Sequence, residues 1–144
     1  MGDRSVEGPL CTAAKAGKRR GMKTALAHYP PHIRRAALIV AIGLALLIGY
    51  FSLVPPNDSP MPHLSDKVRH FAAYALLAVP VAMWLGPGRL SAVALLTAFG
   101  AAIEVAQAFA GTGRDASIWD GLADLLGAAA GAGLIWIVAL TRRP

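Results

Sequence analysis

The sequence predicts an all-α membrane protein in which four transmembrane helices form an antiparallel bundle. Hydrophobic residues make up 56% of the 144 residues and charged residues 15%, against about 25% charged residues in soluble domains. The hydrophobic residues fall in four long runs, which short polar segments separate. Each run has roughly the 20 residues that an α-helix needs to cross the hydrocarbon core of a bilayer. We therefore expect the lipid bilayer to surround most of the chain.

The first half of the chain contains two of the predicted spans. Residues 1–35 are polar and rich in Gly, Lys and Arg, which predicts a disordered basic tail before a membrane domain over 36–144. The first span is predicted at 36–54, which contains no charged residue and ends at a proline-rich segment. The second span is predicted at 67–85. It contains Pro80, which a membrane helix tolerates with a local kink.

The second half contains the other two spans. The third is predicted at 89–109, after a Gly-Pro-Gly turn, and its one acidic residue is Glu104. The fourth is predicted at 118–140, where Ser117 and Asp120 have the spacing of a capping box. Short connections between consecutive helices favour antiparallel neighbours.

Basic residues orient the predicted bundle. With both termini in the cytoplasm, eleven of the fourteen Lys and Arg residues lie on the cytoplasmic side and three on the outer side. The opposite orientation would invert this distribution. We therefore predict both termini in the cytoplasm and a location in the inner (cytoplasmic) membrane. The basic residues flank an apolar body without a nucleic-acid recognition motif, so no nucleic-acid partner is expected.

Polar residues of the membrane region gather at the span ends that this topology places on the outer side. They are Asp66, Lys67, His70, Tyr74, Glu104, Gln107, Arg114, Ser117, Asp120 and Asp124. Ionisable side chains at this depth are costly to expose to lipid, so we expect them to face one another. Gly127 and Gly131 continue the face of the last two carboxylates as a Gly-x-x-x-Gly step, on which another helix packs closely. This step could also support a homo-oligomer.

These residues, in this order, resemble the pattern of the VanZ-like family of small bacterial membrane proteins. The pattern is Asp66-Lys67-x-x-His70-Phe71-x-x-Tyr74, Glu104-x-x-Gln107, Gly113-Arg114-x-x-Ser117-x-x-Asp120, Gly127 and Gly131. It covers about residues 36–140 and departs from the family at Asp124, where Asn is frequent. The resemblance implies a protein of the bacterial cell envelope. Because the family's namesake is associated with teicoplanin resistance, it also implies an effect on glycopeptide antibiotic susceptibility.

One interpretation of the polar residues is structural, with no ligand and a scaffold or partner-binding role. Asp120 then completes the capping box with Ser117, and Arg114 pairs with Glu104. His70 donates a hydrogen bond to a neighbouring carboxylate. Buried ionisable groups satisfy one another in such a network.

A second interpretation is a binding site for a lipid headgroup, a lipid-linked cell-wall precursor or a glycopeptide. A pocket of mixed charge at the outer side of the bundle would hold this ligand without converting it. The candidate binding residues are Asp66, Lys67, Tyr74, Gln107, Arg114, Ser117 and Asp124.

A third interpretation is an enzyme that acts on a lipid-linked envelope substrate. The candidate catalytic residues are His70, Glu104 and Asp120, with His70 as general base and either Asp66 or Glu104 orienting its ring. No nucleophile motif accompanies them. A single histidine with carboxylates is a poor transition-metal signature, so the sequence predicts neither a metal nor another cofactor.

Overall fold

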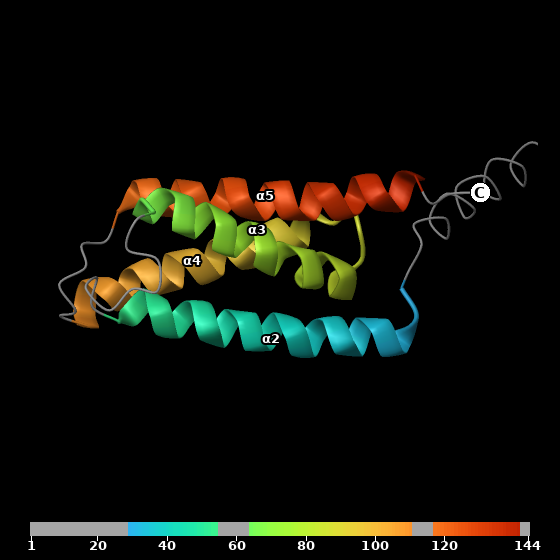
Figure 1. The fold of residues 1–144 in the computed structure, drawn as a ribbon, viewed down its shortest axis with the longest axis horizontal. Helices are drawn as coiled ribbons and strands as arrows, with labels where there is room; N and C mark the ends of the chain where they lie inside the picture. The colour runs from blue at the N-terminus through green and yellow to red at the C-terminus, as the bar shows by residue number, and fades with distance from the viewer. Residues whose placement is uncertain (1–28, 55–63, 111–116, 142–144) are drawn as a thin grey trace, which may run out of the picture.

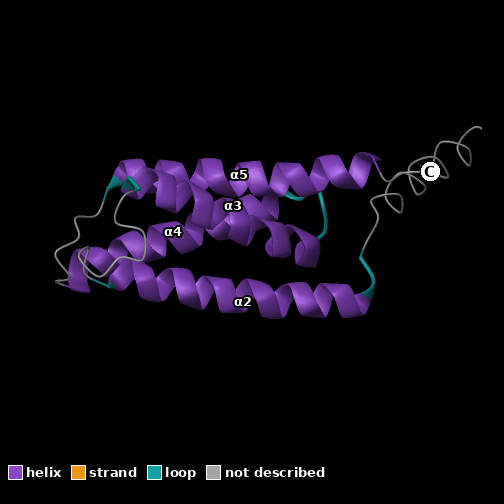
Figure 2. Cartoon of the chain, in the orientation of Figure 1, coloured by secondary structure: helices purple, strands orange, loops and turns teal. Residues whose placement is uncertain are grey.

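The chain folds into four helices over the described residues of a computed structural model, which are 29–54, 64–110 and 117–141. The helices are α2 (Pro31–Leu53), α3 (Asp66–Leu85), α4 (Leu90–Ala110) and α5 (Ile118–Thr141), and they lie side by side (Figures 1 and 2). All four are long and apolar enough to cross a membrane. The prediction of an all-α protein with four candidate spans is confirmed. The predicted tail up to residue 28 and the proline-rich loop lie outside the described residues.

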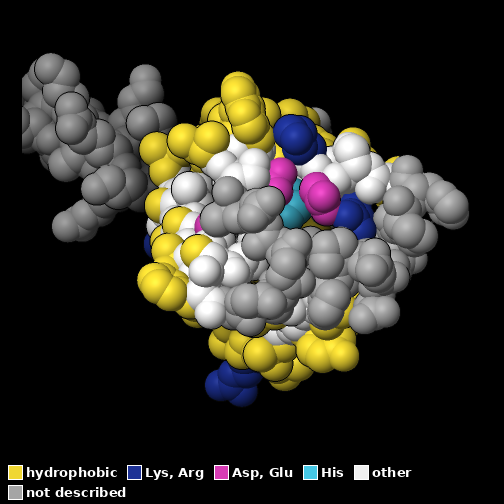
Figure 3. Space-filling view, turned by 90° about the vertical axis from the view of Figure 1, so that its left-hand side faces the viewer, with side chains coloured by type: hydrophobic (Ala, Val, Ile, Leu, Met, Phe, Trp, Pro, Cys, Tyr) yellow, Lys and Arg dark blue, Asp and Glu magenta, His cyan; other side chains and the backbone are white. Residues whose placement is uncertain are grey.

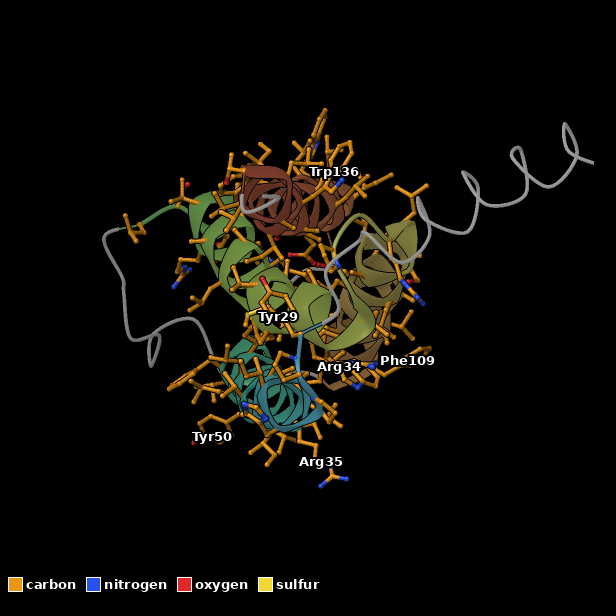
Figure 4. The ribbon with its side chains drawn as sticks, turned by 90° about the vertical axis from the view of Figure 1, so that its right-hand side faces the viewer. Tyr29, Arg34, Arg35, Tyr50, Phe109 and Trp136 are labelled. Atoms are coloured by element: carbon orange, nitrogen blue, oxygen red, sulfur yellow. The ribbon has the colours of Figure 1, made fainter. Side chains whose placement is uncertain are left out.

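Helix α2 begins at Pro31, before the predicted start at Ala36. A proline suits the first turn of a helix because its fixed φ is helical and its missing N–H needs no partner there. The predicted tail therefore ends too late, and two of its arginines are helical. Arg34 Nε donates a hydrogen bond to the Trp84 carbonyl oxygen in the last turn of α3, at 2.8 Å. Arg35 points away from the bundle (Figure 4).

Helices α3 and α5 pack backbone to backbone through the predicted glycine face. A Cβ atom on Gly127 would overlap the carbonyl oxygen of Phe71, and one on Gly131 would overlap the carbonyl oxygen of Ala75. Only a residue without a side chain permits this approach of two helices. Gly127 and Gly131, which the sequence predicts as a helix-packing surface, thus lie where α5 approaches the backbone of α3.

The outer surface of the bundle is apolar, as a lipid-facing surface requires. Ile39 and Leu46 of α2 are 71% and 70% exposed. Trp119 and Trp136 lie toward opposite ends of α5 and are also largely exposed, and Figure 4 shows Trp136 on the outside of the bundle. Amphipathic aromatic rings at both ends of a span are typical of membrane–water interfaces. Helix α3 continues through the buried Pro80.

Candidate functional site

The predicted polar residues gather at one end of the bundle. Hydrogen bonds at this end join α3 to α5, α4 to α2, and the start of α5 to α4. Figure 3 shows histidine and acidic side chains together at this end, with Lys or Arg side chains beside them and hydrophobic side chains toward the edge of the view. We use the name polar layer for His70 of α3, Glu104 of α4, and Asp120 and Asp124 of α5.

His70 and Asp124 form the buried centre of the polar layer. Their side chains are 10% and 2% exposed, and Nδ1 of His70 lies 2.9 Å from Oδ1 of Asp124. Because a carboxylate only accepts, the imidazole N–H donates this hydrogen bond. A carboxylate partner for His70 was predicted, but Asp66 and Glu104 were the wrong residues. Asp66 is exposed in the first turn of α3 and pairs with Arg69.

In the predicted capping box, the Asp120 side chain accepts a hydrogen bond from the backbone N–H of Ser117. In the structure, Glu104 of α4 accepts this hydrogen bond instead. The backbone N–H of Ser117 donates to Oε2 of Glu104 at 2.7 Å. Free N–H groups and the positive end of the macrodipole make a helix N-terminus attractive to a carboxylate, and here it comes from a neighbouring helix. The capping-box prediction is therefore wrong. The predicted pairing of Glu104 with Arg114 lies outside the described residues.

Three buried polar atoms of this region have no hydrogen-bond partner among the described residues. They are the Tyr74 hydroxyl oxygen, Oε1 of Glu104 and Oδ1 of Asp120. Leaving such an atom unpaired costs about 1–3 kcal/mol, so each requires an explanation. All three were predicted as candidate site residues, and the helix geometry brings them to the same end of the bundle.

Gly100 is a site residue that the sequence analysis did not identify. A Cβ atom at this position would lie 2.5 Å from Oδ2 of Asp124 and 3.2 Å from the Tyr74 hydroxyl. The absent side chain therefore leaves room for both groups between the helices. Its position one helical turn before Glu104, on the same face, was the available signal.

The three candidate catalytic residues converge. His70, Glu104 and Asp120 each offer one potential ligand atom, and these atoms lie within 4.8 Å of one another. They come from three different helices, so the fold and not a local motif brings them together. The arrangement can hold a cation between two carboxylates and an imidazole, or it can present an imidazole that Asp124 orients for proton transfer.

Several predicted binding residues lie apart from this convergence. Asp66 and Lys67 are exposed at the start of α3. Gln107 is buried, but its Nε2 donates to the Ser52 carbonyl oxygen at 2.8 Å and so joins α4 to α2. Arg114 lies outside the described residues. The polar layer is thus smaller and more acidic, in its described part, than the sequence predicted.

The chain was compared with protein families, curated proteins and solved structures. It matches no family model, no curated protein and no solved structure.

Proposed function

We propose that this chain is a VanZ-like multi-pass protein of the bacterial inner membrane that binds an envelope ligand through its polar layer. The ligand class is a lipid-linked cell-wall precursor or a glycopeptide, and binding alters susceptibility to teicoplanin-type antibiotics. Antiparallel helices with both termini in the cytoplasm are part of the proposal, and the distribution of basic residues supports them. The VanZ-like motif order supports the envelope role.

The unpaired buried oxygens of Glu104 and Asp120 carry the binding proposal. In a layer that only stabilises the fold, buried polar atoms are hydrogen-bonded, since unpaired ones lower stability. A binding site leaves such atoms for its ligand. This observation favours a ligand over a scaffold without one.

The His70–Asp124 pair supports an enzyme as the second candidate function. The carboxylate fixes the tautomer and the orientation of the ring, which a general base requires. A membrane-embedded enzyme with this base would act on the same lipid-linked class of substrate. Loss of such an enzyme would leave its substrate unprocessed, whereas loss of a binding protein would not.

A gene deletion tests the proposal in the organism that encodes the chain. Deletion should change teicoplanin susceptibility, and the wild-type gene should restore it. Glu104→Gln and Asp120→Asn should fail to restore it while accumulating normally in the membrane. Asp66→Asn is the matched control, because it neutralises a carboxylate outside the polar layer. Full restoration by both layer variants would refute a functional layer, and accumulation of a lipid-linked precursor in their strains would favour the enzyme.

Cysteine labelling tests the proposed topology. In a Cys11→Ser background, Asp58→Cys and Gly113→Cys should react with a membrane-impermeant maleimide from the outer side of the membrane. Reaction only from the cytoplasmic side would refute the orientation.

A further inference from the structure

We propose that His70, Glu104 and Asp120 together bind one divalent first-row transition-metal ion, Zn²⁺ or Mn²⁺. Their candidate ligand atoms lie within 4.8 Å of one another. On a tetrahedral ion, metal–ligand bonds of about 2.0–2.2 Å put two ligand atoms about 3.3–3.6 Å apart. The separation of the candidate ligand atoms therefore has to shrink by about 1–1.5 Å, which rotation of the Glu104 and Asp120 side chains can supply.

The two partly satisfied ligands are already oriented by groups outside the cluster. His70 gives its Nδ1–H to Asp124, which leaves Nε2 with the lone pair that a metal needs. A carboxylate on the far nitrogen of a metal-binding imidazole is the usual outer partner in protein metal sites. Glu104 uses Oε2 to accept the Ser117 N–H and keeps Oε1 free. Asp124 is thus a positioning residue and not a ligand.

Each ligand also keeps an atom that nothing else among the described residues satisfies. Oε1 of Glu104 and Oδ1 of Asp120 are buried without a hydrogen bond. The His70 side chain is nine-tenths buried, and its only described hydrogen bond is the one through Nδ1. Residues that converge within 4.8 Å and each keep an unsatisfied atom are the expected state of a metal site before the ion is added.

Charge balance favours a divalent ion. The polar layer has three carboxylates and one imidazole, so its four residues carry a net negative charge with ionised carboxylates, whether the imidazole is neutral or protonated. Uncompensated charge at membrane depth is costly. A divalent ion balances Glu104 and Asp120, while Asp124 keeps its hydrogen bond from His70.

The ligand set also selects the ion. Imidazole suits Zn²⁺ and carboxylate suits Mn²⁺, whereas Mg²⁺ and Ca²⁺ prefer oxygen ligands alone. A single histidine is a poor metal signature in a sequence, but the fold brings it together with two carboxylates. Three protein ligands leave coordination positions open. These positions would accept a phosphate oxygen of a lipid-linked precursor, and this last step rests on the proposed function. A divalent ion held by the carboxylates would explain how an acidic site accepts an anionic headgroup.

Metal binding to the purified protein tests the site. The full 144-residue chain in mild detergent is stripped with a chelator, and binding of ZnCl₂, MnCl₂ and MgCl₂ is then measured by titration calorimetry and elemental analysis. We expect one Zn²⁺ or Mn²⁺ per chain and weaker binding of Mg²⁺. Asp120→Asn and Glu104→Gln, which keep side-chain size, should abolish stoichiometric binding. Asp124→Asn should weaken it by roughly 10- to 100-fold, the range typical of outer-shell partners.

The same metal-binding measurement on a control variant tests whether the loss of binding is specific to the proposed ligands. Asp66→Asn should bind like the wild type, and circular dichroism with gel filtration shows that every variant is folded. Substoichiometric binding by the wild type, binding by Asp120→Asn equal to the wild type, or a preference for Mg²⁺ would overturn the metal site. The susceptibility assay is independent. If Asp120→Asn fails there but no ion binds, only the metal site is refuted, and if an ion binds but susceptibility never changes, only the proposed function is refuted.

Discussion

Replacing Gly127 by alanine tests whether the α3–α5 contact controls stability. The added Cβ would overlap the Phe71 carbonyl oxygen and lie 3.1 Å from the Ala75 nitrogen. Both obstacles are backbone atoms, so no side-chain rotation relieves them and the helices must separate. Overpacking of this kind costs about 1–3 kcal/mol. Alanine in a helix interior gains about 1 kcal/mol over glycine, so we expect a net loss of up to about 2 kcal/mol in the free energy of unfolding.

Gly133→Ala is the matched control in the same helix. A Cβ at Gly133 meets nothing within 4 Å, so only the propensity gain of up to about 1 kcal/mol remains. Both variants are unfolded in mixed micelles by increasing fractions of dodecyl sulfate, with tryptophan fluorescence and circular dichroism as readouts. Gly127→Ala should unfold at a lower fraction than the wild type, and Gly133→Ala at the same or a higher one. Equal midpoints for the two variants would refute the backbone contact.

The same unfolding assay checks two further contacts. Arg34→Ala removes the hydrogen bond to the Trp84 carbonyl and should cost about 1–2 kcal/mol, whereas the outward-facing Arg35→Ala should stay within about 0.5 kcal/mol of the wild type. Gln107→Ala leaves the Ser52 carbonyl oxygen without its donor and should cost about 1–3 kcal/mol, and a wild-type midpoint for this variant would show that α4 and α2 do not depend on the bond.

The four spans could be predicted because hydropathy along the chain is enough to identify a membrane helix. The start of α2 could not be predicted from hydropathy, because the apolar run begins at Ala36 whereas the helix begins at Pro31. Arginines near a membrane interface do not end a helix, since their long side chains reach polar partners. Arg34 does so by reaching the end of α3, a contact between residues fifty positions apart.

The gathering of polar residues at one end of the bundle could also be predicted, since depth follows from position along each helix. The partners could not be predicted, because they depend on how each helix is rotated about its axis. The close α3–α5 contact at Gly127 fixes that rotation, and it brings Asp124, three residues earlier, against His70. The local capping rule for Asp120 failed for a similar reason, since Glu104 of another helix occupies the N–H group of Ser117.

Unpaired oxygens in the polar layer make stability itself a test of what the layer does. If Asp120 only stabilised the fold, Asp120→Asn would remove interactions and lower the free energy of unfolding. In a site that leaves its Oδ1 buried and unpaired, neutralising the carboxylate removes a charge penalty. Functional sites commonly reduce stability in this way. We therefore expect Asp120→Asn to raise the free energy of unfolding of the chelator-treated protein by about 1–3 kcal/mol in the dodecyl sulfate assay. A comparable decrease would show that the carboxylate is part of a satisfied network, and the binding proposal would lose the observation that carries it.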